Sequence, residues 1–169
     1  MYGGILNVPS RWVSGWKNSL NRPPYSVRFG NFSGVGWLVF GYSARMDHSS
    51  GFLNLVNDAK KHINEISVAE ARARLTANPN SVLLDVREDH EWQAEHAAEA
   101  VHLGKGILER DLEKLYPAKD AEIIMYCGGG FRSALTADAA QKMGYRNVSS
   151  LIGGFKALVA AGWQMNKGQ

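Results

Sequence analysis

Cysteine is nearly absent from this chain: Cys127 is the one cysteine among 169 residues. A single cysteine excludes an internal disulfide framework and any zinc site that is built from several cysteines. A lone cysteine is either a small buried hydrophobe or a reactive nucleophile, and the residues around it decide between the two. The surroundings of Cys127 are therefore the first place to look for chemistry.

Long hydrophobic runs are also missing. A transmembrane helix needs about 18 or more consecutive apolar residues, whereas the nearest approach, residues 35–42, is far shorter and contains Gly36 and Gly41. We therefore expect no membrane partner. The chain is 45% hydrophobic and 21% charged, which is typical of an ordinary soluble globular protein. Because a lone reactive cysteine favours a reducing compartment, we expect a cytoplasmic location.

Acidic residues are absent from the first 45 positions, which carry five basic residues. The remaining chain has 14 basic and 16 acidic residues, so its balance is −2 although the net charge of the whole chain is +3. A nucleic-acid-binding surface typically combines a basic face with interleaved aromatic residues. The sequence after residue 45 shows no such pattern, and we expect no nucleic-acid partner.

Residues 1–45 also differ from the rest in composition and pattern. They contain three of the five tryptophans and many glycines and serines, and their apolar residues show no periodic spacing. We predict that they form an extension outside the folded domain, either disordered or translated from a start upstream of the true one at Met46. A targeting peptide and a secretory signal remain alternatives. Residues 46–64 are expected to contain a leading amphipathic helix, and residues 65–165 the main domain.

Short apolar runs alternate with helical patterns from Glu65 onward. Expected strands cover residues 63–66, 82–84, 123–126 and 148–151, and expected helices cover residues 67–75, 90–96, 107–115, 133–143 and 155–161. The first of these helices begins with Ser67 and Glu70, the pair of a capping box. Strands separated by helices of this length predict an α/β fold with three layers, in which helices flank a central, mostly parallel sheet.

Cys127 directly follows the expected strand 123–126 and precedes three glycines and a helix. Ligands of parallel α/β sheets bind outside the carboxyl ends of the strands. The glycines let several backbone N–H groups point to one spot, the helix presents its positive end, and Arg132 adds a full charge. These effects favour an accessible thiolate, the reactive form of cysteine. The alternative is that Cys127 fills the end of the sheet and the glycines make a turn.

The loop Cys127-Gly128-Gly129-Gly130-Phe131-Arg132-Ser133 resembles the Cys-x-x-Gly-x-Arg-Ser active-site loop of rhodanese-like domains. Further pieces follow the order of that family over roughly residues 63–165. Residues 84–87 resemble its Asp-x-Arg strand end, residues 96–103 its Gly-His-Ile-Pro-Gly-Ala segment, and residues 151–154 with Gly162 its glycine-rich ending. The resemblance implies the three-layer rhodanese-like fold.

The resemblance also implies a sulfurtransferase with Cys127 as the catalytic nucleophile. Its thiolate would attack the outer sulfur of a donor such as thiosulfate, and the resulting persulfide would pass its sulfur to a thiol, a protein or cyanide. Arg132 is the second expected catalytic residue, and with Ser133 it would hold the anionic end of the donor. The resemblance also implies that the persulfide is bound by residues of the loop, namely Gly128, Gly129, Gly130, Phe131 and Ser133. No metal and no organic cofactor is implied, and we expect a monomer or a weak homodimer.

Other polar residues near the expected strand ends have two interpretations each. Asp85 and Arg87 would either support the mouth of the site or form a structural ion pair, and we favour the ion pair. His96 and His102 do not have the spacing of metal ligands on a helix, so we expect hydrogen-bonded loop residues. Tyr126 is expected in the core, because neighbouring residues of a strand face opposite sides.

Two alternatives to a sulfurtransferase remain. The first is a persulfide carrier or protein-recognition module with little free turnover. The second is a cysteine phosphatase or an arsenate reductase, because cysteine phosphatases also place a Cys-to-Arg loop at a helix N-terminus. Their loop has five residues between the two, whereas four lie between Cys127 and Arg132. The shorter loop makes a narrower cradle, which suits a sulfur atom better than a phosphate.

A chain that begins at Met46 is expected to express, fold and transfer sulfur as well as the longer chain, because the predicted elements of the domain all follow that residue. Thermal unfolding and a thiosulfate–cyanide assay on both chains test this expectation. Insolubility of the shorter chain, or a loss of more than a few kcal/mol in its free energy of unfolding, would mean that residues 1–45 pack on the domain.

Overall fold

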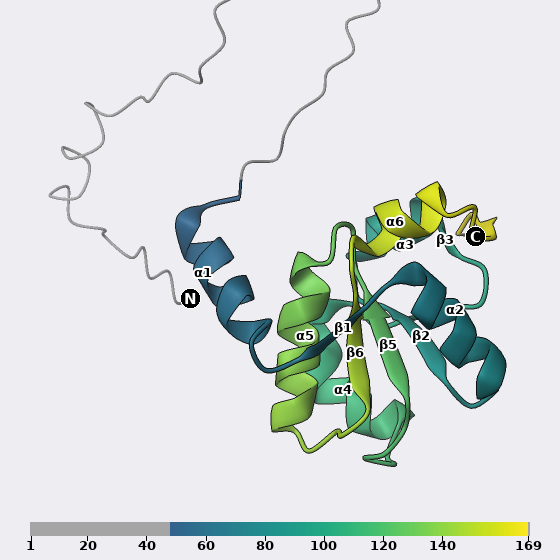
Figure 1. Cartoon of the computed structure of the whole chain (residues 1–169). Helices are drawn as coiled ribbons and strands as arrows, with labels where there is room; N and C mark the ends of the chain where they lie inside the picture. The colour runs from purple at the N-terminus through teal and green to yellow at the C-terminus, as the bar shows by residue number, and fades with distance from the viewer. Residues whose placement is uncertain (1–47, 169) are drawn as a thin grey trace, which may run out of the picture. The chain divides into compact units, whose positions relative to one another are not determined.

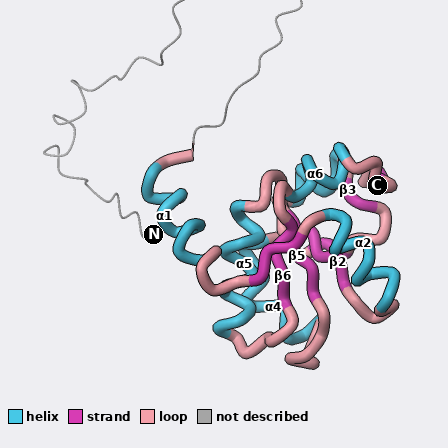
Figure 2. Tube along the Cα trace, viewed as in Figure 1, coloured by secondary structure: helices cyan, strands magenta, loops and turns pink. Residues whose placement is uncertain are grey.

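The computed structural model describes residues 48–168, which belong to one compact unit, Arg45–Gln169. The expectation for residues 1–45 lies outside the described residues. Helices and strands alternate along the described part of the chain, as Figure 2 shows. Within residues 48–168, none of the helices has the length and apolar character needed to cross a membrane.

Five strands form the central sheet in the order β1-β6-β5-β2-β4. They are β1 (Asn64–Ile66), β2 (Val82–Asp85), β4 (Val101–His102), β5 (Ile123–Tyr126) and β6 (Val148–Leu151). Each pairing within this sheet is parallel. A separate antiparallel pair joins β3 (His96–Ala97) to β7 (Met165–Asn166). The prediction of a mostly parallel central sheet is confirmed.

Helices cover both faces of the sheet (Figure 1). On one face lie α4 (Leu108–Leu115) and α5 (Phe131–Lys142), and on the other lie α2 (Val68–Ala77) and α6 (Gly154–Ala160). Side chains alternate along β5, so Ile123 and Met125 pack with α4 and α5. Ile124 and Tyr126 pack with α2 and α6. The predicted three-layer α/β fold is therefore confirmed.

The starts of two helices follow from their local sequence. The Ser67 hydroxyl accepts a hydrogen bond from the Glu70 amide at 3.2 Å, and the Glu70 carboxylate accepts one from the Ser67 amide at 2.8 Å. The predicted capping box is thus confirmed. Helix α5 begins at Phe131, earlier than the expected residue 133, because Gly130 turns the chain with a φ of 91° and serves as the N-cap.

Some short elements differ from the expectation. Strands β3, β4 and β7 have two residues each, which is too few for an alternating pattern to show in a sequence. Helix α3 (Asp89–Ala94) ends before the expected residue 96, because His96 pairs with Asn166 between β3 and β7. A 3-10 turn, η2 (Lys105–Ile107), precedes α4, so the helix expected from residue 107 begins at Leu108.

Helix α1 (Ser50–Ala59) packs against α5. Its N-cap is Ser49, whose side chain accepts a hydrogen bond from the Phe52 amide at 3.4 Å. Val56 is 1% exposed and Ala59 is buried, whereas the neighbouring Leu55 is 64% exposed. This helix lies within the residues where the leading helix is expected, and its buried side belongs to the same compact unit as the sheet.

Val56→Asp should lower the free energy of unfolding by at least about 2 kcal/mol, because it places a charge in the contact between α1 and α5. Leu55→Asp is the matched control on the same helix, and its exposed position should limit the change to about 0.5 kcal/mol. Urea unfolding of both variants measures the difference. Equal stability of the two would show that α1 does not pack on α5 in solution.

Candidate active site

The loop that carries Cys127 leaves the carboxyl end of β5, the middle strand of the sheet, and leads directly into α5 (Figure 2). Gly130 turns the chain in a left-handed conformation that glycine adopts without strain. The turn brings the Gly130 amide to 3.2 Å from Cys127 Sγ, to which it donates a hydrogen bond. The sulfur thus lies at the N-terminal end of α5, where the helix amides favour a negative charge.

A second hydrogen-bond donor reaches the sulfur from the first turn of α5. The Ser133 hydroxyl donates to Cys127 Sγ at 3.7 Å, and the hydroxyls of Ser133 and Ser150 lie 2.9 Å apart. Both serines are fully buried. In this structure the Ser133 hydroxyl therefore contacts the sulfur itself, and its contact with the anionic end of a donor stays a prediction.

Cys127 is 1% exposed, so the expectation of an accessible thiolate is wrong for this structure. The reason is the alternation of side chains at the end of β5. Tyr126 packs with α2 and α6, and Cys127 turns the opposite way, into the core with Leu84, Val86 and Leu103. The thiol is therefore not offered at the surface of this structure.

The pair Gly153-Gly154, the N-cap and first residue of α6, holds the cysteine loop from the other side. The Phe155 amide donates a hydrogen bond to the Cys127 carbonyl at 2.6 Å. A Cβ atom at Gly154 would lie 2.1 Å from that carbonyl oxygen, and the φ of Gly154 is +54°. A residue with a side chain does not fit there without a shift of the backbone. The glycine pair noticed in the sequence therefore sets the position of the cysteine loop.

Arg132, in the first turn of α5, is bound by carboxylates of α3 and its N-cap. Its Nη1 lies 2.6 Å from Glu91 Oε2 and its Nη2 lies 2.9 Å from Glu91 Oε1, a bidentate pair. Glu88 Oε1 lies 3.4 Å from Nη1. The hydrogen bonds from Arg132 hold the pKa of Glu91 below its usual value, and the same bonds raise the pKa of Arg132. The guanidinium thus has a partner within the protein, and its catalytic role stays a prediction.

Sequence reasoning did not single out Glu88 or Glu91 as partners of Arg132. They stand 44 and 41 positions away from it along the chain. The available signal was the acidic stretch directly after β2. Acidic residues are favourable in the first turn of any helix, so the stretch alone did not indicate a partner.

Asp85 and Arg87 form a buried ion pair at the carboxyl end of β2, with Arg87 Nη2 2.6 Å from Asp85 Oδ2. Arg87 Nη2 also donates to the Glu95 carbonyl at 2.7 Å, and the guanidinium lies 4.1 Å from the centroid of the Phe155 ring. The pair thus ties β2 to the segment after α3 and to α6. The structure contains the ion pair that the structural interpretation expects.

Tyr126 lies in the core beside α2 and α6, as predicted, and burial raises the pKa of its phenol. Its hydroxyl accepts a hydrogen bond from the Ala97 amide at 3.3 Å. His96 and His102 stack on the Trp92 ring, with centroids 3.5 and 5.0 Å away. Both histidines are hydrogen-bonded to backbone carbonyls, as expected, although they lie in β3 and β4 and not in loops.

Phe131 places its ring against α1, a contact that sequence reasoning did not foresee. The ring centroid lies 4.6 Å from that of His48 and 6.2 Å from that of Phe52. Lys60 Nζ lies 5.9 Å from the same centroid. Helix α1 therefore borders the cysteine loop on one side, while α3 borders it on another through the carboxylates that bind Arg132.

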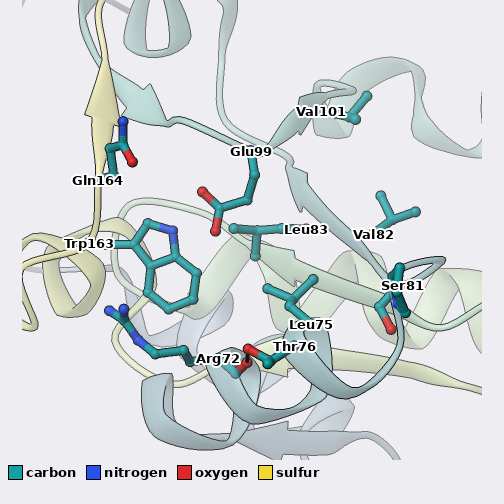
Figure 3. Close-up of a pocket in the computed structure, with 11 residues that line it drawn as sticks. Arg72, Leu75, Thr76, Ser81, Val82, Leu83, Glu99, Val101, Trp163 and Gln164 are labelled. Atoms are coloured by element: carbon teal, nitrogen blue, oxygen red, sulfur yellow. Dashed lines mark hydrogen bonds between the residues drawn. The ribbon is translucent and has the colours of Figure 1, made fainter.

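A hollow of about 410 Å³ adjoins the cysteine loop, and its lining includes Glu91, Gly128, Phe155 and Lys156. Another hollow, of about 530 Å³, is formed by α2, the start of β2 and the segment before β7, with Trp163 in its wall (Figure 3). The residues of the cysteine loop do not line this second hollow. Of these two hollows, the one beside Gly128 is the one that touches the cysteine loop.

The fold and the site together define a class, an open parallel α/β domain with a cysteine between its middle strand and the following helix. A family model described as the rhodanese-like domain matches residues 67–161, more than half of the chain. The chain belongs to the rhodanese-like domain family. Helix α1 precedes the residues that the family model matches.

Curated relatives in this family carry sulfurtransferase names. The thiosulfate sulfurtransferase GlpE of Coxiella burnetii is 36% identical over 75 residues, which cover 44% of this chain and 68% of that protein. The putative sulfurtransferase YtwF of Bacillus subtilis is 33% identical over 87 residues, which cover 52% of this chain and 82% of that protein. Other relatives, at 29% identity, are named as a putative sulfur carrier protein and a tRNA uridine(34) hydroxylase.

Solved structures show the same architecture. The protein of unknown function RPA3614 from Rhodopseudomonas palustris, described as a possible tyrosine phosphatase, has a TM-score of 0.63 and 26% identity, covering 71% of this chain and 97% of that one. The polysulfide-sulfur transferase homodimer of Wolinella succinogenes has a TM-score of 0.61 and 24% identity, covering 69% and 88%. The second similarity concerns the fold alone.

Gly154→Ala should destabilise the protein by clearly more than about 2 kcal/mol, because the new Cβ collides with the Cys127 carbonyl in addition to the strain of a left-handed backbone. Gly162→Ala is the matched control. Its φ is +64° and nothing lies within 4 Å of the new Cβ, so only the conformational cost of about 1–2 kcal/mol applies. Denaturant unfolding compares the two variants, and equal losses would mean that Gly154 does not fix the loop.

Proposed function

We propose that this chain transfers a sulfane sulfur from a donor to an acceptor through a persulfide on Cys127. The observation that carries the proposal is the pair of hydrogen bonds that the Gly130 amide and the Ser133 hydroxyl direct at the Cys127 sulfur, at the N-terminus of α5. Donors that converge on one sulfur stabilise a negative charge there. They therefore favour the thiolate, which is the nucleophilic form of cysteine.

In the first half-reaction the Cys127 thiolate attacks the outer sulfur of a donor such as thiosulfate. A new sulfur–sulfur bond forms, the sulfur–sulfur bond of the donor breaks, and the electron pair leaves with sulfite. In the second half-reaction a thiolate or cyanide attacks the outer sulfur of the persulfide, and Cys127 leaves as a thiolate. Two half-reactions that share one covalent intermediate give ping-pong kinetics.

The loop residues support the persulfide between the two half-reactions. The added sulfur would lie among the amides of Gly128, Gly129 and Gly130, where no Cβ atom competes for the space. Phe131 and Ser133 continue this row of amides into α5. Arg132 adds positive charge at the edge of the loop, although Glu91 shares that charge.

A cysteine phosphatase is less well supported, even though one similar structure is described as a possible tyrosine phosphatase. Glu91 occupies the Nη1–Nη2 edge of Arg132, so a phosphate in the loop would have to displace that carboxylate to bind the same edge. The loop also has one residue fewer between Cys127 and Arg132 than the phosphatase loop has. Both features disfavour a bound phosphate.

A persulfide carrier is the second candidate function. The putative sulfur carrier protein YrkF of Bacillus subtilis is 29% identical over 94 residues, which cover 56% of this chain and 50% of that protein. Burial of Cys127 would also slow its exchange with free small molecules. A thiol or protein acceptor, a monomer or weak homodimer, and a cytoplasmic location stay predictions of this proposal.

Cys127→Ser should abolish sulfur transfer and leave the fold intact, because a serine hydroxyl is nearly isosteric with the thiol but does not ionise near neutral pH. Intact-mass spectrometry after incubation with thiosulfate should show one added sulfur atom on the wild-type chain and none on the variant. Rates with thiosulfate and cyanide should fall to background.

Unfolding curves of the Cys127→Ser variant serve as the control for its fold. The chain has no second cysteine, so activity of the purified variant would contradict the proposal. An added sulfur on the wild-type chain with negligible turnover of thiosulfate and cyanide would favour the carrier over the enzyme.

A further inference from the structure

Two carboxylates surround the guanidinium at the edge of the cysteine loop. Glu91 binds both Nη atoms of Arg132, and Glu88 Oε1 lies 3.4 Å from Nη1, so two negative charges face one positive charge. We call these three residues the Arg132 cluster. The side chains of Arg132 and Glu91 are each 26% exposed, so the cluster faces solvent while it is partly shielded from it.

The Arg132 cluster lies against the cysteine loop at Gly128. A Cβ atom on Gly128 would be 3.3 Å from Arg132 Nη2 and 3.7 Å from Glu91 Oε1. An anion that approaches the loop amides at this position therefore meets a carboxylate together with the guanidinium. Because both Nη atoms already donate to Glu91, a sulfonate gains a bidentate contact with the Nη1–Nη2 edge of Arg132 only by displacing that carboxylate.

The adjoining hollow has no excess of positive charge that would offset the carboxylates. In its lining, Arg87 is neutralised by Asp85, and Glu95 and Lys156 carry opposite charges. Phe155 adds an aromatic wall. A volume of about 410 Å³ is enough for an organic group, which thiosulfate does not have.

We propose that Glu91 is a specificity-determining residue that, through Arg132, selects sulfur donors with an organic group and at most one negative charge over the dianion thiosulfate. This selection rests on the sulfur transfer by Cys127 proposed above. Alkyl persulfides and organic thiosulfonates are donors of this class. With a persulfide R–S–SH, the Cys127 thiolate bonds to the outer sulfur, the sulfur–sulfur bond of the donor breaks, the electron pair leaves with RS⁻, and the proton stays on the transferred sulfur.

The test compares kcat/KM for thiosulfate with kcat/KM for methanethiosulfonate, CH₃SO₂S⁻, with cyanide as the acceptor of both. The two donors release an outer sulfur from a similar group and differ by one charge and one methyl group. Glu91→Gln should shift the preference toward thiosulfate by roughly tenfold, because glutamine keeps an acceptor for Arg132 and loses the charge. An unchanged preference in the folded variant would overturn the selection.

Asp89→Asn is the matched control for Glu91→Gln. Asp89 stands between the two glutamates of the cluster in sequence, its side chain is 88% exposed, and its Oδ1 lies 3.9 Å from His102 Nε2. Removal of the same charge at this position should change the preference by less than about twofold, since exposed charges are screened. Equal shifts in Asp89→Asn and Glu91→Gln would refute a specific role for the Arg132 cluster.

A measurement on the unmodified full chain does not depend on the folding of any variant. Salt should raise kcat/KM for thiosulfate relative to methanethiosulfonate, because it screens the repulsion of the dianion more strongly. If salt instead lowered kcat/KM for thiosulfate relative to methanethiosulfonate, the selection would be overturned. Intact mass separates the two claims: sulfur on Cys127 with an unchanged preference refutes the selection alone, whereas no added sulfur from either donor refutes the sulfur transfer and the selection with it.

Discussion

The close contact between the Gly153-Gly154 turn and the cysteine loop is the constraint on which the site depends. The Phe155 amide reaches the Cys127 carbonyl at 2.6 Å because residue 154 has no side chain to keep the two segments apart. This contact holds the loop where the Gly130 amide meets the sulfur. The end of β5, the turn after β6 and the start of α5 thus form one unit, and the hydrogen bonds of the sulfur follow from the packing of backbone against backbone.

Two arginines near the loop are each matched by carboxylates, but in different surroundings. Arg87 is buried with Asp85 and joins the end of β2 to the segment after α3. Arg132 is partly exposed and shares its charge with Glu91 beside the loop. The positive charge that the sequence suggests around Cys127 is therefore largely offset in the folded protein, and the backbone amides remain as the main source of attraction for an anion.

Local patterns were sufficient to predict most of the fold and the position of the cysteine loop. The strand Ile123–Tyr126 is a continuous apolar run, and the glycines and helix that follow Cys127 are its neighbours in sequence. The contacts that the sequence did not predict join segments that are far apart along the chain. Glu91 binds Arg132, which lies 41 positions further along the chain, and Phe131 contacts α1, the helix that precedes all strands of the sheet. The burial of Cys127 likewise depends on the helices that cover one face of β5, which no short window of sequence contains.

Behind the sulfur, the buried hydroxyls of Ser133 and Ser150 form a short chain that ends at Cys127. A hydroxyl group has one proton to donate. While Ser133 donates to the sulfur, it can only accept in its hydrogen bond with Ser150, so a negative sulfur aligns both O–H bonds toward itself. A change of charge on the Cys127 sulfur therefore changes the orientation of two hydroxyl groups, one on α5 and one on β6.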